Sequence, residues 1–359
     1  MVEWKEYRIK DLGEVVTGNT PPTSNREYYG TEYKFIKPTD MVEGQRFVST
    51  TEEYYSELAY QKYKKCLLPP KTPCVVTIGS LGKKMCLTDT ECFTNQAVNA
   101  VIPNKENDGE FLYYAFKASV LAYVKQLDSG TTSGRENVSK SSFSKIKVRV
   151  PPLPTQQKIA SILSAYDNLI QNYKKQIEAL QTAASELYKE WFVRFRFPGY
   201  KNSRFENGIP EGWKIERLTK LVGIKYGKDH SKLDDGNIPV YGSGGIMRYC
   251  NKALYDKETV LIPRKGSLNN IMYANRPLWT VDTMFYSIML RKNFAKYLYY
   301  VLSKIDMESF NAGAALPSMT TEILSHFKII VPDNKTLELF DNKIASVSYT
   351  HLTLPTKRI

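Results

Sequence analysis

The chain has 359 residues, 42% of them hydrophobic, which is enough for two domains that each bury a core. Its 50 Lys and Arg against 37 Asp and Glu give a net charge of +13, which favours a polyanionic partner such as nucleic acid. No apolar run is long enough to span a membrane and the N-terminus has no signal-peptide core, so we expect a cytoplasmic protein without a membrane partner.

Residues 1–154 are predicted to form a mixed α/β domain. Short runs rich in Val, Ile, Tyr and Phe alternate with turn signals that contain Gly and Pro. Residues 110–126 place apolar side chains at roughly helical spacing, which predicts one helix. Residues 145–150 alternate charged and apolar side chains as a half-buried strand does, and the prolines that end at Pro154 close the domain.

Residues 155–194 are predicted to form one long coiled-coil helix, which Thr155 can cap. Its apolar residues follow one another at alternating steps of four and three over more than four heptads, without Gly or Pro. At about 1.5 Å per residue this helix is roughly 60 Å long, so we interpret it as a spacer. The positions that we expect to bind a partner are Leu163, Tyr166, Ile170, Tyr173, Ile177, Leu180, Leu187 and Trp191.

Residues 195–332 are predicted to form a second domain that repeats the first. Trp4 and Pro151 recur as Trp213 and Pro332, at offsets of 209 (213 − 4) and 181 (332 − 151). The second copy is therefore 28 residues shorter (209 − 181). Between these anchors the loops of the two copies share little, which indicates one scaffold that recognises two different targets.

Residues 333–347 begin a second helix of the same kind, with apolar steps of three, four and three from Leu337 to Val347. Residues 348–359 contain β-branched residues and Pro355, so we expect the pattern to stop there and interpret this segment as foreign or out-of-frame sequence. A shortened second helix would leave the apolar stripe of the first partly unpaired. A partner subunit or a second copy of the chain would then cover it.

The order of these parts resembles the specificity subunit of type I restriction-modification systems. The resemblance covers residues 1 to about 347 and combines the repeat with four segments. These are the closing motif VRVPPLPTQQKI at 148–159, EWFV at 190–193, FIKPTD at 35–40 and IPVYGSGG at 238–245.

The resemblance implies that each domain is a target recognition domain for one half of a bipartite double-stranded DNA site. The helix would set the spacing of the halves and dock methyltransferase subunits, and restriction subunits would join through the assembled complex. S-adenosylmethionine and ATP would serve those partners. We therefore expect a non-catalytic subunit that needs no cofactor.

We expect the DNA contacts to lie in loops, because base edges are reached by long donors, and phosphates by hydroxyl and backbone donors. The candidates in the first domain are Gly79, Ser80, Lys83, Lys84, Asn95, Gln96, Thr131, Thr132 and Arg135. Those in the second domain are Tyr241, Ser243, Arg264, Lys265, Ser267 and Arg276. For each lysine, the alternative that it lies on the solvated surface without contacting DNA stays open.

No motif favours an enzyme. The chain has no phosphate-binding P-loop, and GSGG at 242–245 lacks the spacing of a dinucleotide site. The five cysteines lack the close pairs of zinc sites, and the three histidines stand far apart, so we predict neither a metal nor a catalytic residue. Two alternatives stay open: a coiled-coil scaffold whose basic domains bind nucleic acid without sequence preference, and a DNA-modifying enzyme with an unrecognised site.

Overall fold

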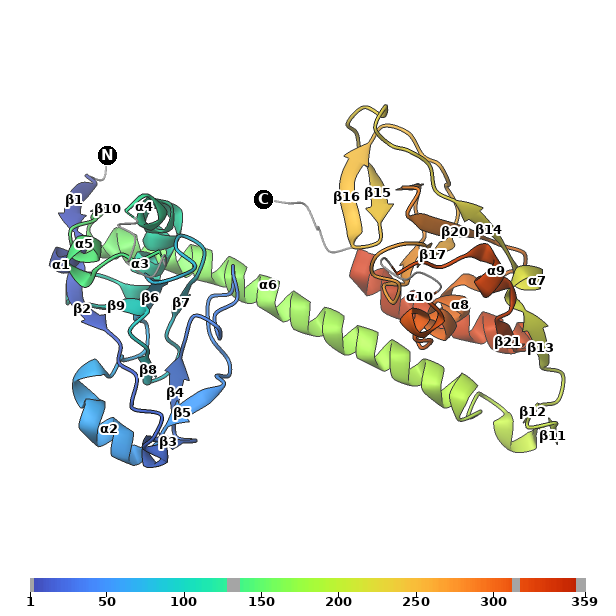
Figure 1. Cartoon of the computed structure of the whole chain (residues 1–359), viewed down its shortest axis with the longest axis horizontal. Coiled ribbons are helices and arrows are strands. Elements are labelled where there is room, and N and C mark those ends of the chain that lie inside the picture. Colours follow the sequence, from blue (N-terminus) through green and yellow to red (C-terminus); the bar gives the residue numbers. More distant parts are fainter. Residues whose placement is uncertain (1–2, 128–135, 312–316, 353–359) are drawn as a thin grey trace. The chain divides into compact units, whose positions relative to one another are not determined.

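The computed structural model describes residues 3–127, 136–311 and 317–352, the last seven by their backbone alone. The chain divides into two compact units, Met1–Tyr173 and Lys174–Ile359, called unit 1 and unit 2 below. Helix α6 (Leu153–Tyr188) begins in unit 1 and ends in unit 2 (Figure 1). Within the described ranges, no helix is both long and apolar enough to cross a membrane.

The core of unit 1 is an antiparallel sheet of four strands in the order β2-β9-β6-β7, covered by helices. The strands are β2 (Gly13–Thr17), β9 (Val98–Pro103), β6 (Pro73–Val76) and β7 (Met85–Leu87). The helices are α3 (Gly109–Ala115) and α4 (Leu121–Gln126), joined by a π-helical turn (Phe116–Val120), which together confirm the predicted helix at 110–126. Because β6 is buried along its whole length, this sheet forms the centre of the unit.

A second sheet of unit 1 has the order β3-β5-β4-β8 and an aromatic core. Its elements are β3 (Tyr29–Gly30), β4 (Tyr33–Ile36), β5 (Glu53–Tyr55), β8 (Cys92–Thr94) and the flanking helix α2 (Glu57–Tyr63). Tyr55 stacks on Phe93 with ring centroids 4.7 Å apart, and Phe35 contacts Tyr55 at 4.6 Å. Such aromatic contacts stabilise a small sheet beyond the area that they bury.

The chain enters and leaves unit 1 at one end, called the base below. Strand β1 (Lys5–Arg8) pairs antiparallel with β10 (Lys147–Val150), and α1 (Ile9–Leu12) and α5 (Lys140–Ser144) flank the pair. The alternating exposure of β10 confirms the half-buried strand. Helix α6 then starts at Leu153, two residues before the predicted start, so Thr155 lies inside its first turn and is not the cap. Pro154 fits there because the first turn needs no N–H donor.

Unit 2 repeats this architecture with a sheet in the order β14-β20-β17-β18. Its strands are β14 (Val222–Tyr226), β20 (Met284–Met289), β17 (Thr259–Pro263) and β18 (Met272–Ala274), and β13 (Lys214–Arg217) pairs with β21 (Lys328–Val331) at the base. Further elements are α7 (Leu218–Leu221), α8 (Ala295–Leu302), α9 (Thr321–Ser325), β11 (Phe205–Glu206) and β12 (Ile209–Pro210). The predicted fold class, two similar mixed α/β domains with a long helix, is confirmed.

The second sheet of unit 2 differs from that of unit 1. It has three strands in the order β16-β15-β19, namely β16 (Gly245–Cys250), β15 (Ile238–Gly242) and β19 (Trp279–Thr280). In unit 1 the connection between β4 and β5 runs through residues 37–52, whereas β15 and β16 are joined by a tight turn. The shared scaffold therefore carries different loops.

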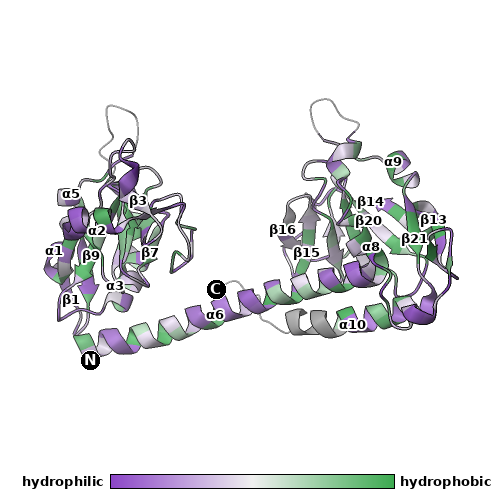
Figure 2. Ribbon diagram, turned by 90° about the horizontal axis from the view of Figure 1, so that it is seen from below, coloured by the Kyte–Doolittle hydropathy of each residue, from purple (hydrophilic) through white to green (hydrophobic). Residues whose placement is uncertain are grey.

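Helix α6 ends in a π-helical turn (Lys189–Val193) beside α10 (Asn334–Leu352) in unit 2 (Figure 2). Trp191 and Phe192 lie in the core there and contact Phe340 of α10, with ring centroids 5.9 and 4.8 Å away. Helix α10 runs five residues beyond its predicted end at 347. The reason is that residues 348–352 include a single β-branched residue, and Pro355 lies three residues further on.

Candidate nucleic-acid interface

In unit 1, three chain segments meet at the end of the central sheet away from the base, called the loop edge below. The C-terminal end of β6 faces the start of β9, because Val76 pairs with Val98. Beyond that pair, the Thr77 amide donates to the carbonyl of Ala97 at 2.8 Å, and the Val138 amide donates to the carbonyl of Thr77 at 2.8 Å. The turn after β6, the turn before β9 and the segment around residue 137 therefore lie side by side.

The turn at 79–84 presents two of its predicted residues to solvent. Gly79 has a φ of +88°, a left-handed conformation that favours glycine. Its amide donates to the carbonyl of Glu136 at 2.9 Å, which fixes the turn. Ser80 and Lys83 are exposed, whereas the Lys84 ammonium donates to the carbonyl of Pro38 at 2.8 Å. Ser80 and Lys83 can therefore reach a ligand, and Lys84 holds the chain.

Of the next two predicted residues, Asn95 holds a turn and Gln96 lies on the surface. The Asn95 side-chain oxygen accepts from the amide of Ala97 at 3.1 Å and shapes the turn before β9. Gln96 is exposed and accepts from the Thr20 hydroxyl, so its amide lies on the surface. The other candidates of this unit, Thr131, Thr132 and Arg135, lie outside the described residues.

The loop edge of unit 2 is built at the matching place, around the turn that follows β17. The Arg264 amide donates to the carbonyl of Thr283, and the Met319 amide to the carbonyl of Arg264, both at 2.8 Å. The Arg264 guanidinium donates to the carbonyl of Asp282 at 3.1 Å and lies 5.4 Å from the ring centre of Tyr226. These contacts hold the positively charged Arg264 guanidinium at the edge of the sheet.

The structure also brings the predicted Ser243 to this turn. The side-chain amide of Asn270 donates to the carbonyl of Ser243 at 2.7 Å. A Cβ on Gly266, whose φ is +84°, would meet the Ser243 hydroxyl at 2.7 Å, so the two turns are in contact. Lys265 is half-buried and Ser267 is exposed. The tip of the β15–β16 hairpin and the turn after β17 thus form one surface.

Two predicted residues of unit 2 do not belong to that surface. Tyr241 is 8% exposed and packs in the core beside the second sheet, so its prediction as a DNA contact was wrong. Its aromatic ring fills an inward position of β15. Arg276 is exposed but follows β18, whose Ala274 pairs with Thr259 at the start of β17. It therefore lies at the opposite end of β17 from Arg264, and its contact with DNA stays a prediction.

Helix α6 leaves much of its apolar stripe uncovered in unit 1. Five large apolar side chains of its N-terminal half are 38–64% exposed, namely Ile162, Leu163, Tyr166, Leu169 and Ile170. Figure 2 shows hydrophobic residues recurring along this half. The helix meets the domain through a different face, which carries Ala160 and Asp167. Because exposed apolar surface of this extent marks interaction sites, this face is a candidate partner surface.

The C-terminal part of the predicted stripe is occupied inside unit 2. Trp191 is buried and Leu187 packs against the core of this unit, so their prediction as free partner contacts was wrong. Tyr173, Ile177 and Leu180 are half-buried. The aromatic end of the helix is used within the chain because α8 and α10 lie against it.

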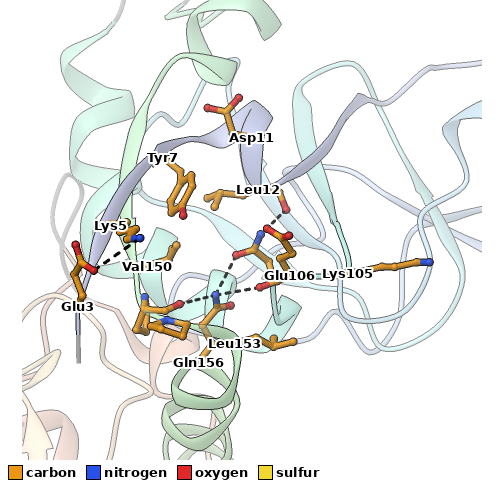
Figure 3. Close-up of a pocket in the computed structure, with 13 residues that line it drawn as sticks. Glu3, Lys5, Tyr7, Asp11, Leu12, Lys105, Glu106, Val150, Leu153 and Gln156 are labelled. Atoms are coloured by element: carbon orange, nitrogen blue, oxygen red, sulfur yellow. Dashed lines mark hydrogen bonds and ion pairs between the residues drawn. The ribbon is translucent and has the colours of Figure 1, made fainter. Parts of the chain in front are cut away.

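A buried glutamine that the sequence did not single out ties α6 to the base of unit 1. The Gln156 side-chain oxygen accepts from the amide of Asp108 at 2.9 Å. Its side-chain nitrogen donates to the carbonyl of Pro151 at 2.9 Å and to the Asn107 side chain at 3.1 Å. Gln156 lines a pocket of about 430 Å³ at the start of the helix (Figure 3). The first turn of α6 is therefore fixed to the loop between β9 and α3.

A second polar contact, also missed, holds α6 three turns further on. The guanidinium of Arg46, a buried residue, donates to the Tyr114 hydroxyl at 3.0 Å and to the Asn168 side-chain oxygen at 2.9 Å. Tyr114 in turn donates to the Asp167 carboxylate at 2.8 Å. Burial and this hydrogen bond raise the pKa of Tyr114 to about 12, so it stays a neutral donor. The network fixes the direction in which α6 leaves the domain.

At the base of unit 2, Asp333 performs the matching task for α10. Its carboxylate accepts from the indole of Trp213 at 3.1 Å and from the amide of Thr336 at 3.0 Å, which caps the helix. Burial alone would raise the pKa of Asp333, but hydrogen bonds from Thr336 and Trp213 outweigh it and lower that pKa. The carboxylate therefore stays charged where it joins strand and helix.

The described residues offer no metal centre, since no three His, Cys, Asp or Glu side chains among them gather closely enough to hold an ion. The cysteines in this part are free thiols. Burial, together with nearby charges, raises the pKa of the Cys92 thiol, which makes it a poor nucleophile.

Two copies of one sheet with unlike loops, joined by a helix, define a two-domain internal-repeat protein. The chain belongs to the family of the type I restriction modification DNA specificity domain, whose sequence model matches residues 1–182 and 210–347. This confirms the resemblance stated above.

The relatives of this chain are specificity subunits. It is 32% identical over 235 residues to the type I restriction enzyme MjaIX specificity subunit of Methanocaldococcus jannaschii, which covers 63% of this chain and 53% of that protein. It is 35% identical over 175 residues to the HindI specificity subunit of Haemophilus influenzae, with coverage of 47% and 38%. The chain thus spans about half the length, or less, of these curated relatives.

A solved structure shares the fold over nearly the whole chain. The crystal structure of the type I restriction-modification S subunit from M. genitalium aligns with a TM-score of 0.66 at 19% identity and covers 98% of this chain and 94% of that one. At this identity the match supports the fold alone.

Proposed function

We propose that this chain is the DNA sequence-specificity subunit of a type I restriction-modification complex and is itself non-catalytic. Each unit reads one half of a bipartite double-stranded DNA target. The observation that supports this most strongly is that the two units share one sheet topology but differ in the loops at the same edge. A protein that binds DNA without sequence preference gains nothing from two different loop edges.

The contacts that we propose lie at the loop edges. In unit 1 they are made by Ser80, Lys83 and Gln96, which are exposed there. In unit 2 they are made by Ser243, Arg264, Lys265 and Ser267 around the turn after β17. Arginine gives bidentate hydrogen bonds to guanine, glutamine to adenine, and lysine and serine hold phosphates. Each edge combines groups of both kinds.

We assign to α6 the spacing of the two halves and the docking of partners. Its 36 residues correspond to about 54 Å at 1.5 Å per residue. The exposed side chains Leu163, Tyr166 and Ile170 would pack against a methyltransferase subunit, and restriction subunits would join through that assembly. Association with a second copy of the chain is the other way to cover this face.

The test is methylome sequencing of cells that express this chain with and without a methyltransferase subunit encoded beside it. A split motif with a fixed gap should appear only when both proteins are present. Exchanging residues 79–84 for the same turn of another specificity subunit should change one half of the motif and leave the other half and the gap unchanged. A continuous motif, or methylation that does not depend on this chain, would contradict the proposal.

A further inference from the structure

Unit 2 carries an exposed apolar strand beside its basic turn. On β16, Ile246 is 40% exposed and Met247 is 59% exposed, although both belong to a paired strand. Tyr249, further along the same strand, is 38% exposed. The pairing of β15 with β16 shifts register between Val240 and Tyr241, so that Met247 is an extra residue of β16, and two consecutive apolar side chains are both in solvent there. The β15–β16 hairpin therefore extends beyond the core.

One edge of this hairpin is open. In the order β16-β15-β19, strand β16 has a partner on one side alone among the described residues. In unit 1 the corresponding strand β5 lies between β3 and β4, and its apolar side chains join an aromatic core. An uncovered edge with apolar side chains invites a partner, and natural proteins rarely leave one exposed without a function. The exposed hairpin is thus specific to unit 2 (Figure 1).

The position of the hairpin points to its partner. Its tip contacts the turn after β17 through Ser243, whose carbonyl accepts from Asn270 at 2.7 Å. That turn carries Arg264 and Lys265, so the tip of the hairpin adjoins two cations at the loop edge. Cations beside an apolar surface suit a ligand with a negatively charged backbone and an apolar interior, which is the chemistry of a DNA groove.

We propose that the β15–β16 hairpin enters the major groove of the half-site read by unit 2, where Ile246 and Met247 contact the C5-methyl groups of thymines. The major groove admits a two-stranded ribbon, and apolar side chains recognise thymine there by its methyl group. Gly242 leaves room for the Met247 side chain in the hairpin, since a Cβ at position 242 would meet the Met247 sulfur at 2.5 Å. This inference rests on the proposed function and adds a base-reading element that hydrogen bonding alone does not supply.

The experiment uses the full chain with its methyltransferase subunit and a duplex that carries the motif identified by methylome sequencing. Each thymine is replaced in turn by uracil, which removes the methyl group alone. Wild-type affinity should fall about fourfold at one or two thymines of one half-site, the factor expected for one buried methyl group. Met247→Ser or Ile246→Ser should lose a similar factor on the thymine duplex and lose nothing more on the uracil duplex.

Ile215→Ser is the matched control, because Ile215 is 57% exposed on β13 at the base of the same unit. It should bind both duplexes as the wild type does. If the wild type binds its motif but no uracil substitution is coupled to either hairpin variant, the hairpin proposal is overturned while the proposed function stands. If the complex recognises no bipartite motif, both proposals fail.

Discussion

Replacing Gln156 by leucine should destabilise unit 1 because this side chain is almost completely buried and fully hydrogen-bonded. It makes three bonds of 3.1 Å or less, to the Asp108 amide, the Pro151 carbonyl and the Asn107 side chain. A net contribution of about 1 kcal/mol for each bond gives a loss of about 3 kcal/mol. For a unit of this size the loss corresponds to a fall in melting temperature of roughly 6–12 °C.

Calorimetry of the full chain measures the melting temperature, and hydrogen exchange of the Asp108 amide reports the contact itself. Gln157→Leu is the matched control, since Gln157 has the same chemistry one residue along α6 but is exposed. It should change stability by less than about 0.5 kcal/mol. Equal melting temperatures for the two variants, or an Asp108 amide that stays protected in Gln156→Leu, would refute the reasoning.

Three further predictions concern the other surfaces. Tyr166→Glu should leave the melting temperature unchanged but abolish co-purification with a methyltransferase subunit, whereas Ser161→Glu on another face should not; equal recovery of both variants would contradict the docking assignment. Arg264→Ala should lose about 1–3 kcal/mol of DNA affinity and relax one position of the motif, whereas Lys83→Ala should weaken all sequences alike, as competition with singly substituted duplexes can check. Because the folded pKa of Asp333 is lowered, its stabilising effect should be present above the ordinary aspartate pKa of about 3.9 and be lost as the pH falls through the folded value. Thermal melts of Asp333→Asn should lack that part of the pH dependence.

The features that the sequence predicts correctly are local or repeated. The 3.5-residue period predicts α6, the alternation at 145–150 predicts β10, and the recurrence of Trp4 and Pro151 as Trp213 and Pro332 predicts the second unit. Each pattern depends on neighbours within a few residues, or on a comparison of the chain with itself. Such patterns predict structure correctly because they do not depend on which distant residues pack against them.

The features that the sequence did not predict depend on strand register. Tyr241 and Arg276 look like loop residues, but the pairing of β15 places the first in a core and the pairing of β17 with β18 sends the second to the other end of the sheet. Arg46 and Gln156 have no local signal at all, since their partners Asn168 and Asp108 lie 122 and 48 residues away. Contacts between residues this far apart in the sequence are determined by tertiary packing.

The pairing of β1 with β10, and of β13 with β21, gives each unit a single entrance and exit at its base. The chain between those strands can therefore change without moving the attachment of the flanking helices. A gene for such a protein can acquire a new recognition domain as a cassette, provided that the four-residue strands at its two ends still pair. New DNA specificities would then arise by recombination between related genes, while the paired strands and the flanking helices stay unchanged.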